Sequence, residues 1–351
     1  MIGHVSSVGS GFQRQTSITR VGKDRVPRDV ATREIRQKYF FAMEGMTEFR
    51  YFSGIRDNFI IRNRRGGTVD LQLVSRDLCN KDRADPMFNL EMLRDYTHAL
   101  SHPHEVAPGI ALGRILTQLY DMVEIEEKDL HEKFNELLEQ VKGSDAYDGH
   151  RFISDIDVFM GVVTDFLTKH GVPYDVVKRL EFPVYDQGYN PDLDKLCLIV
   201  DRDYTRVRNV DWESRDYEYY DKLVASCGPD ATGDLKHVRL FVTNPCFELW
   251  LALHFNESLE FSDEMREKLR RERKEEGGQK TSFHVISEII MNRFGVEYDK
   301  GRIDFDNWFK SRVGDAVNNV VDGGYCTDVK GLNKYIGSNL GVLLKDIVPK
   351  D

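Results

Sequence analysis

The segment "KLCLIVDRD", residues 195–203, restricts the fold more than any other part of the chain. Its apolar run from Leu196 to Val200 is unbroken and ends at Asp201. Such a run is typical of a central strand in a parallel sheet, because a strand of this kind is covered on both faces. We therefore expect an α/β fold with a mostly parallel sheet flanked by helices.

Three further segments have the character of strands. Residues 38–43 are aromatic and apolar, residues 68–75 ("TVDLQLVS") alternate apolar and polar side chains, and residues 238–242 are again mainly apolar. Helical patterns lie between these segments, with apolar residues recurring at intervals of three and four. This alternating order of strands and helices predicts an α/β layer.

Two helices are expected to begin directly after strands. In "MEGMTEF", Gly45 permits a tight turn and Thr47 can cap the following helix. In "VTNPCFELW", Asn244 can cap a helix that has Pro245 at its first position. Glu248 would then be the fourth helical residue, which is a poor position for a capping carboxylate.

The pattern divides the chain into five parts. Residues 1–35 are rich in Ser, Gly, Thr and Arg and predict a flexible lead-in. Residues 36–76 and 195–261 hold the predicted strands and form the two parts of the sheet domain. Residues 77–194 predict a mainly helical insertion, and residues 262–351 predict a helical C-terminal region.

Composition is that of a globular protein in a reducing compartment. The chain has 351 residues with 40% hydrophobic content, which is enough for a large core. Its five cysteines are scattered without a C-x-x-C pair, which argues against a disulfide framework or a zinc knuckle. No apolar run approaches the roughly 18 residues of a membrane helix, and no signal peptide is recognisable. We expect a cytoplasmic protein without membrane association.

Positive charge is concentrated near the N-terminus although the formal net charge is −10. Residues 1–38 contain eight Lys or Arg against three Asp or Glu, and Arg50, Arg56, Arg62, Arg64 and Arg65 follow. The net charge argues against nonspecific coating of nucleic acid. The local cluster is a candidate track for phosphate groups, although solvated surface explains each arginine taken singly.

Carboxylates follow three of the four predicted strands. Glu44 ends the first, Asp201 and Asp203 end the third, and Glu248 lies just beyond the fourth. The carboxyl ends of parallel strands face a common crevice, where ligands bind. Asp201 and Asp203 are two residues apart and point the same way in an extended chain. Oxygen ligands without His or Cys favour Mg²⁺ or Mn²⁺ over zinc, so a magnesium site is expected here.

Taken together, the motifs resemble the RloB-like family of the TOPRIM superfamily. The resemblance rests on "FFAMEGMTEFRYF", "LCLIVDRD" and "LFVTNPCFELWLALHF" in this order, and on "YDKGRIDFDNWF" and "TDVKGLNKYI" near the C-terminus. It covers about half of the chain and leaves the role of the long helical insertion open. The fold that it implies is a TOPRIM-like sheet domain.

The resemblance implies a metal-dependent nuclease of bacterial anti-phage defence, of the abortive-infection kind, related to the nuclease halves of overcoming-lysogenization-defect proteins. Carried onto this sequence, the catalytic metal ligands are Glu44, Asp201 and Asp203. Glu48 is a further candidate metal ligand, and Glu248 is a further candidate catalytic acid. The implied cofactor is Mg²⁺ or Mn²⁺.

Substrate contacts are expected from Arg50, Arg56, Arg202 and Asn244. An arginine can balance the charge that develops on the phosphoryl group during hydrolysis. The expected partners are a nucleic acid, either DNA or RNA with tRNA included, and a partner ATPase or regulator. Association into a homo-oligomer is left open.

Two other functions fit parts of the sequence. "LCLIVDRDYT" also resembles the opening of haloacid dehalogenase-like phosphatases, in which Asp201 would be the nucleophile and Asp203 the general acid and base. Thr243 would imitate that family's second motif. That family also needs a late acidic pair at a strand end, but "VGDAVNNVVDG" predicts an amphipathic helix, and Glu44 would have no role.

The second alternative is a scaffold without catalysis. A TOPRIM-like domain can serve as a binding module that acts through a partner ATPase, with the helical insertion as its docking surface. Acidic residues at three strand ends argue against complete loss of metal chemistry.

Overall fold

The structure is a computed structural model of the whole chain, and every structural statement below concerns the residues that it describes. These are residues 37–59, 61–62, 67–74, 86–102, 105–123, 127–147, 149, 151–183, 189–190, 192–202, 212–228, 231, 237–255, 281–299 and 303–348. The predicted lead-in and the predicted charged helix that ends near residue 276 lie outside them.

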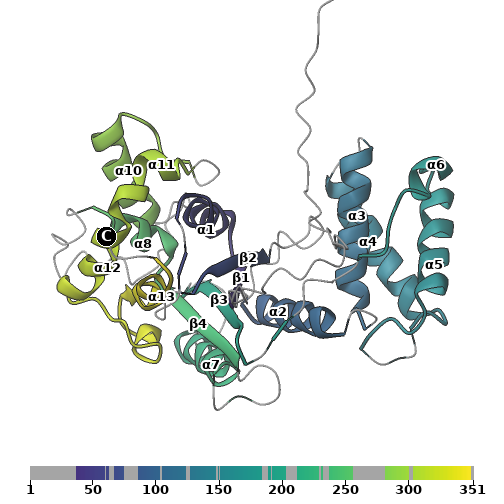
Figure 1. Cartoon of the computed structure of the whole chain (residues 1–351), viewed down its shortest axis with the longest axis horizontal. Coiled ribbons are helices and arrows are strands. Elements are labelled where there is room, and N and C mark those ends of the chain that lie inside the picture. The colour runs from purple at the N-terminus through teal and green to yellow at the C-terminus, as the bar shows by residue number, and fades with distance from the viewer. Residues whose placement is uncertain are drawn as a thin grey trace, which may run out of the picture. The chain divides into compact units, whose positions relative to one another are not determined.

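A five-stranded sheet forms the centre of the fold (Figure 1). Its strand order is β2-β1-β3-β4-β5; β1 to β4 are parallel, and β5 pairs antiparallel with β4. All four predicted strands are present, so the predicted α/β class is confirmed. The strands are β1 (Gln37–Met43), β2 (Val69–Val74), β3 (Lys195–Asp201), β4 (Val238–Asn244) and β5 (Gly337–Ser338).

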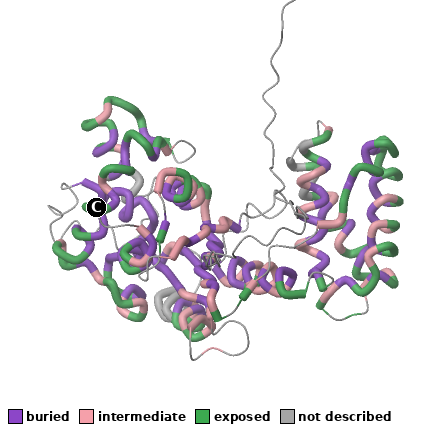
Figure 2. The backbone as a smooth tube through the Cα atoms, in the orientation of Figure 1, coloured by how far each residue is buried: buried purple, intermediate pink, exposed green. Residues whose placement is uncertain are grey.

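Both faces of the sheet are covered, which explains the unbroken apolar runs. In β1, Phe40 and Ala42 pack in one hydrophobic core, whereas Phe41 and Met43 pack in the other. The first core also contains residues of helix α2 (Pro86–Ser101) and helix α7 (Trp212–Ala225), and the second contains residues of helix α1 (Met46–Asn58). Figure 2 shows β1, β3 and β4 as mostly buried, whereas β2 has as many intermediate as buried residues. Successive side chains of a strand point to opposite faces, so each must be apolar.

The strand order creates a topological switch point between β1 and β3. The chain passes from β1 through α1 to β2 on one side of β1, whereas β3 pairs with the other side of β1. In open α/β sheets, ligands bind outside the carboxyl ends of the strands at such a point. Glu44 directly follows β1 and Asp201 ends β3. The topology therefore brings these two predicted site residues to the place where a ligand is expected.

The insertion is helical, as predicted. Its first helix is α2, and Asp155 caps the helix over Ile156–Lys169 by accepting a hydrogen bond from the backbone N–H of Val158. The helix that begins at Pro108 ends at Met122, because the chain is not helical at Val123. No helix among the described residues is both long and apolar enough to cross a membrane. The helices are α3 (Pro108–Met122), α4 (Glu127–Lys142), α5 (Ile156–Lys169) and α6 (Tyr174–Val177).

The C-terminal region contains helices and also completes the sheet. Its short strand β5 was not predicted, because two residues are too few to show an alternating pattern. Ser338 pairs with Thr243, and their hydroxyl groups are hydrogen-bonded over 3.0 Å. The helical elements are α8 (Phe247–Ala252), α10 (Thr281–Phe294), α11 (Phe305–Trp308), η4 (Lys310–Arg312), α12 (Val313–Asp322), η5 (Gly331–Asn333) and α13 (Leu340–Ile347).

Gly337→Ala is expected to destabilise the protein because β5 lies directly against another part of the backbone. A Cβ atom at residue 337 would lie 2.0 Å from the carbonyl oxygen of Cys326 and 2.5 Å from its backbone nitrogen. Backbone atoms cannot rotate away, so we expect a loss near the upper end of the roughly 1–3 kcal/mol found for overpacking. Urea unfolding of the wild type and the variant measures the difference.

Gly161→Ala is the matched control for this prediction. Gly161 lies inside α5, and an added Cβ would meet no atom within 4 Å. Alanine in a helix interior is favoured over glycine by about 0.5–1 kcal/mol, so this variant should be slightly more stable than the wild type. Equal stability of the Gly337→Ala variant and the wild type would contradict the close packing of β5.

Candidate active site

Glu44 and Asp201 meet at the switch point of the sheet. The backbone N–H of Asp201 donates a hydrogen bond to Oε2 of Glu44 over 3.1 Å. Glu44 is 7% exposed, and Asp201 is half-buried. The two residues are 157 positions apart in sequence, so only the pairing of β1 with β3 brings them together. A carboxylate is thus held at the carboxyl edge of the sheet, directly beside a second acidic residue.

Glu48 folds back over the turn that separates β1 from α1. A Cβ atom at Gly45 would lie only 2.5 Å from Oε2 of Glu48, so glycine is the residue that leaves room for this carboxylate. Gly45 is the N-cap residue of α1, which puts Glu48 at the third helical position and Thr47 at the second. The prediction that Thr47 caps the helix is therefore wrong. A carboxylate at this position can satisfy amide groups at the start of the helix as well as face a cation.

Glu248 occupies the equivalent region of α8. The N-cap residue is Cys246, so Glu248 is the second helical residue and is 1% exposed. The predicted cap at Asn244, with Pro245 as the first helical residue, is wrong because Asn244 still belongs to β4. Its side-chain amide instead donates to the carbonyl oxygens of Leu332 and Tyr335 over 2.7 and 3.1 Å. These bonds connect β4 with the C-terminal region.

Tyr298 connects the acidic residues of the two helices, and it was absent from the predicted site. Burial raises the pKa of its phenol, and the negative charges of Glu248 and Glu48 raise this pKa further. Both carboxylates therefore act electrostatically on the same side chain, which is 2% exposed. Tyr298 is the first residue of the segment "YDKGRIDFDNWF" that carried part of the family resemblance. Its position in this segment was the sequence signal that could have pointed to Tyr298 as a site residue.

A buried hydrogen bond between Tyr51 and His254 joins α1 to the end of α8. Nδ1 of His254 lies 3.0 Å from the carbonyl oxygen of Trp250, so it carries the proton and donates. Nε2 therefore accepts from the hydroxyl of Tyr51 over 2.9 Å. Burial lowers the pKa of His254 to about 3 and raises that of Tyr51. This neutral pair holds together the two helices that carry Glu48 and Glu248.

The donor chemistry of this edge fits a hard divalent cation. Three carboxylate side chains (Glu44, Glu48 and Glu248) are each under 8% exposed, and Asp201 is beside Glu44. Gathering buried carboxylates in one region is costly unless hydrogen bonds or a cation balance their charge. Asp203, the remaining predicted ligand, lies outside the described residues. Among the residues described, the group whose candidate ligand atoms all lie within 4.8 Å of one another is instead His98, His102 and Glu105, in another part of the fold.

A family model described as RloB-like protein matches residues 39–319. The chain belongs to the RloB-like family. The match begins inside β1 and ends inside α12, so it includes both parts of the sheet domain and the helical insertion. Neither the curated proteins nor the solved structures gave a match.

In this RloB-like chain, Arg202 points away from the acidic edge. Its guanidinium donates to Oδ1 of Asn333 over 3.0 and 2.8 Å and lies 5.0 Å from the centre of the Tyr220 ring. Asn333 in turn donates to Asp221 over 2.8 Å. Arg202 is 3% exposed, so its contacts connect β3 with the C-terminal region and α7. Its predicted contact with substrate is untested.

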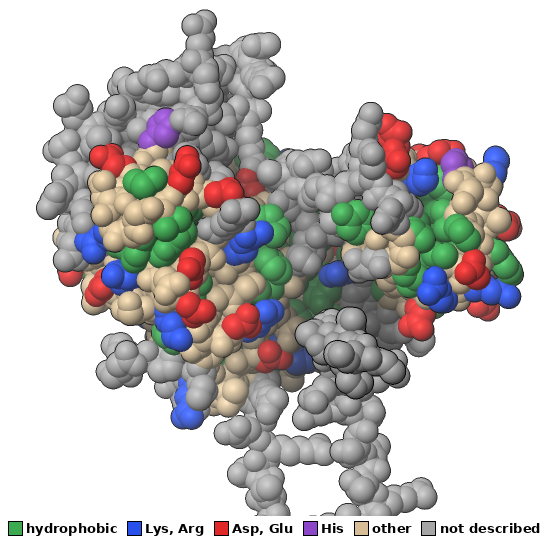
Figure 3. Space-filling model, turned by 90° about the horizontal axis from the view of Figure 1, so that it is seen from above, with side chains coloured by type: hydrophobic (Ala, Val, Ile, Leu, Met, Phe, Trp, Pro, Cys, Tyr) green, Lys and Arg blue, Asp and Glu red, His purple; other side chains and the backbone are tan. Residues whose placement is uncertain are grey.

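The arginines of α1 lie on the exposed side of the helix. Arg50 is exposed, and Arg56 is exposed and pairs with Asp57 over 2.8 Å. Figure 3 shows basic and acidic side chains interspersed on one face of the RloB-like protein. Most of the predicted basic cluster, including Arg64 and Arg65, lies outside the described residues. Arg50 and Arg56 therefore remain candidates for contacts with phosphates that flank the site.

The phosphatase alternative loses support in this RloB-like fold. The segment "VGDAVNNVVDG" forms α12, as predicted, so it supplies no acidic pair at a strand end. Thr243, the proposed second motif, is 1% exposed and its hydroxyl is bonded to Ser338. Glu44, which that mechanism leaves without a role, is the residue that contacts Asp201.

Proposed function

We propose that this RloB-like protein is a nuclease that hydrolyses phosphodiester bonds of DNA or RNA with the help of Mg²⁺ or Mn²⁺. The observation that carries the proposal is the hydrogen bond from the backbone N–H of Asp201 to the carboxylate of Glu44. It joins the two acidic motifs of the sequence at the switch point, where α/β sheets bind ligands. Membership of the RloB-like family supports the same function.

The carboxylates divide into two groups by their position. Glu44, Asp201 and Asp203 would hold the cation, since they follow the two neighbouring central strands. Glu48 and Glu248 lie in the first turns of α1 and α8 and add negative charge that favours a cation nearby. The chemistry that the cation supplies when bound is polarisation of the phosphodiester and activation of water.

Other residues of the site would position the substrate and exclude water. The packed aromatic residues behind the acidic edge, Phe41, Phe52 and Phe247 among them, keep solvent from the buried side of the carboxylates. Arg50 and Arg56, on the exposed face of α1, would contact phosphates on either side of the scissile one. An RNA or DNA strand would therefore run along α1.

We further propose that the nuclease acts in anti-phage defence and is controlled by a partner ATPase or regulator. A nuclease that degrades cellular tRNA or DNA harms its own cell, so its activity must be restrained until infection. The helical insertion offers a surface of α3 to α6 that does not contribute to the acidic edge. A regulator could bind there without occupying the substrate path.

The direct test is an assay with three substrates: plasmid DNA, tRNA and p-nitrophenyl phosphate. We expect cleavage of at least one nucleic acid that requires Mg²⁺ or Mn²⁺ and is abolished by EDTA, with no hydrolysis of p-nitrophenyl phosphate. Because a partner can hold the enzyme inactive, protein purified from phage-infected cells is assayed in parallel. Hydrolysis of p-nitrophenyl phosphate that survives replacement of Glu44 would favour the phosphatase instead.

Mg²⁺ is expected to raise the thermal stability of the protein, whether or not a partner is needed for catalysis. A ligand that binds only the folded state stabilises it, by about 2.7 kcal/mol at a free concentration of 100 times Kd. The double variant Asp201→Asn with Asp203→Asn should lose this stabilisation, because amides replace both charged oxygen donors. Differential scanning fluorimetry with and without Mg²⁺ measures the change.

The control for this measurement is Glu139→Gln, which removes an exposed carboxylate of α4 whose side chain is 74% exposed. This variant should keep the full Mg²⁺ effect. If the double variant kept it as well, the Mg²⁺ site would have to lie elsewhere in the chain.

A further inference from the structure

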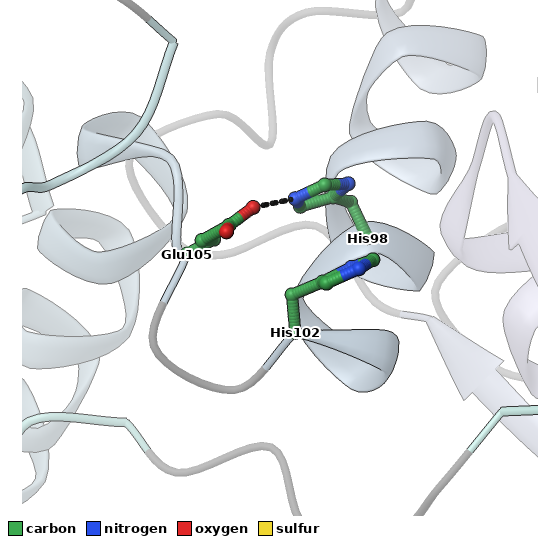
Figure 4. Close-up of side chains that lie close together, drawn as sticks. All are labelled: His98, His102 and Glu105. Atoms are coloured by element: carbon green, nitrogen blue, oxygen red, sulfur yellow. Dashed lines mark hydrogen bonds and ion pairs between the residues drawn. The ribbon is translucent and has the colours of Figure 1, made fainter.

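Two histidines and a glutamate gather at the C-terminal end of α2. His98 lies in the last turn of α2, and His102 follows one turn later, so both imidazoles lie on the same side. Nε2 of His98 and Oε2 of Glu105 are 2.8 Å apart (Figure 4). One candidate ligand atom from each of the three residues lies within 4.8 Å of the other two. This cluster is separate from the acidic residues of the proposed nuclease site.

The backbone and one aromatic ring hold this cluster in place. The backbone N–H of His102 donates to His98 over 2.8 Å, and that of Glu105 donates to His102 over 2.8 Å. The His98 ring is stacked between the rings of His102 and Phe152, with centroid distances of 4.4 and 4.1 Å. The imidazole of His98 therefore has a fixed orientation, whereas His102 and Glu105 are exposed and can adjust.

We propose that His98, His102 and Glu105 bind a divalent transition metal ion of the zinc class. Two imidazole nitrogens and one carboxylate oxygen are the donors that such ions prefer, whereas Mg²⁺ prefers oxygen alone. Donor atoms around tetrahedral zinc are about 3.3 Å apart, given bonds near 2.0–2.1 Å. Small rotations of the two exposed side chains reach this spacing. Three protein ligands leave one coordination position for water or for a residue of another molecule.

The ion would connect the end of α2 to the segment that leads into α3. α2 packs in the core that covers one face of the sheet, whereas Glu105 lies just before α3. The backbone N–H of Ile153 also bonds to the carbonyl oxygen of Val106 over 2.9 Å, so a second segment of the insertion meets the same place. Bound metal would thus link α2 to the segment before α3 and stabilise this junction.

The test is Zn²⁺ binding to the untagged full chain, with Mg²⁺ in large excess so that the carboxylate edge does not take up zinc. Isothermal titration calorimetry is expected to show one Zn²⁺ per chain. Loss of a residue that merely supports a metal ligand lowers metal affinity by roughly 10–100-fold. His102→Asn removes a ligand itself, so it should weaken Zn²⁺ binding by at least as much. Co²⁺ serves as a second probe, since its visible absorption reports nitrogen and oxygen ligands in a site of low coordination number.

His170→Asn is the matched control. His170 also faces a glutamate, with Nε2 3.7 Å from Oε2 of Glu136, and also contacts an aromatic ring. Among the residues that the structure describes, it belongs to no group of three candidate metal ligands. This variant and Asp201→Asn should bind Zn²⁺ like the wild type. The proposal would be overturned if the folded wild type did not bind Zn²⁺. It would also be overturned if the double variant His98→Asn with His102→Asn bound Zn²⁺ as tightly as the wild type. Because the readout is binding, neither result depends on nuclease activity.

Discussion

Glu44→Gln is expected to lower the rate of nucleic acid cleavage by roughly 10²–10³-fold, the cost of removing one group that stabilises charge in a transition state. The backbone N–H of Asp201 donates a hydrogen bond to Glu44 over 3.1 Å, and the amide oxygen of glutamine can still accept this bond. The local fold should therefore survive while the negative charge at the cation site is lost. Cleavage rates at saturating Mg²⁺ measure the effect on the substrate that the wild type cleaves.

The control is again Glu139→Gln, which changes an exposed glutamate to glutamine outside the site. Its rate should equal that of the wild type. Circular dichroism of both variants establishes that they are folded. Full activity of a folded Glu44→Gln variant would remove Glu44 from the catalytic machinery and, with it, the main reason for proposing a nuclease.

His254 is expected to make the protein sensitive to acid. Burial lowers its pKa from 6.5 to about 3, so the folded protein keeps His254 neutral at pH values at which the unfolded chain has already bound a proton. The unfolded state therefore binds more protons, and stability falls as the pH decreases from about 6.5 towards 3. Between pH 7 and pH 5 this one residue should cost about 2 kcal/mol, since one pKa unit corresponds to about 1.4 kcal/mol.

His254→Gln tests this prediction. Glutamine does not take up a proton in this pH range. Its side-chain oxygen can accept the hydrogen bond from the Tyr51 hydroxyl that Nε2 of His254 accepts in the wild type. The free energy of unfolding in urea should therefore fall less steeply with decreasing pH in the variant than in the wild type. Parallel slopes in the wild type and His254→Gln would contradict the buried neutral state.

The strands of the sheet could be predicted because their signals are local. The run from Leu196 to Val200 and the aromatic segment before Glu44 are apolar on both faces, and both became buried strands. The meeting of Glu44 with Asp201 followed from the rule that parallel strands end at one edge of a sheet. Strand β5 could not be predicted, because its two residues acquire their structure only by pairing with Thr243 and Asn244.

The details of the site depended on contacts between distant segments. Thr47 and Asn244 are residue types that favour helix caps, but Gly45 and Cys246 occupy the cap positions. The amide of Asn244 has other partners in the C-terminal region. Tyr298 reaches the acids from a segment far along the chain, and no spacing rule connects it with them.

The histidine and glutamate cluster shows a different limit. His98 and His102 have the spacing of ligands on one face of a helix, but they lie in a segment that the sequence marks only as helical. Glu105 completes the group because the chain turns back after α2. Patterns that predict a helix do not predict how the chain continues beyond its end.

The sheet is completed by residues 332–338, which are synthesised after strands β1 to β4. β5 pairs with β4, Asn333 holds the guanidinium of Arg202, and the carbonyl groups of Leu332 and Tyr335 hold Asn244. A nascent chain on the ribosome lacks all of these contacts until translation has passed Ser338. The edge that carries Asp201 is thus assembled only after residues 332–338 have been made. For the nuclease proposed above, this order of assembly would keep translation products that stop before Ser338 inactive.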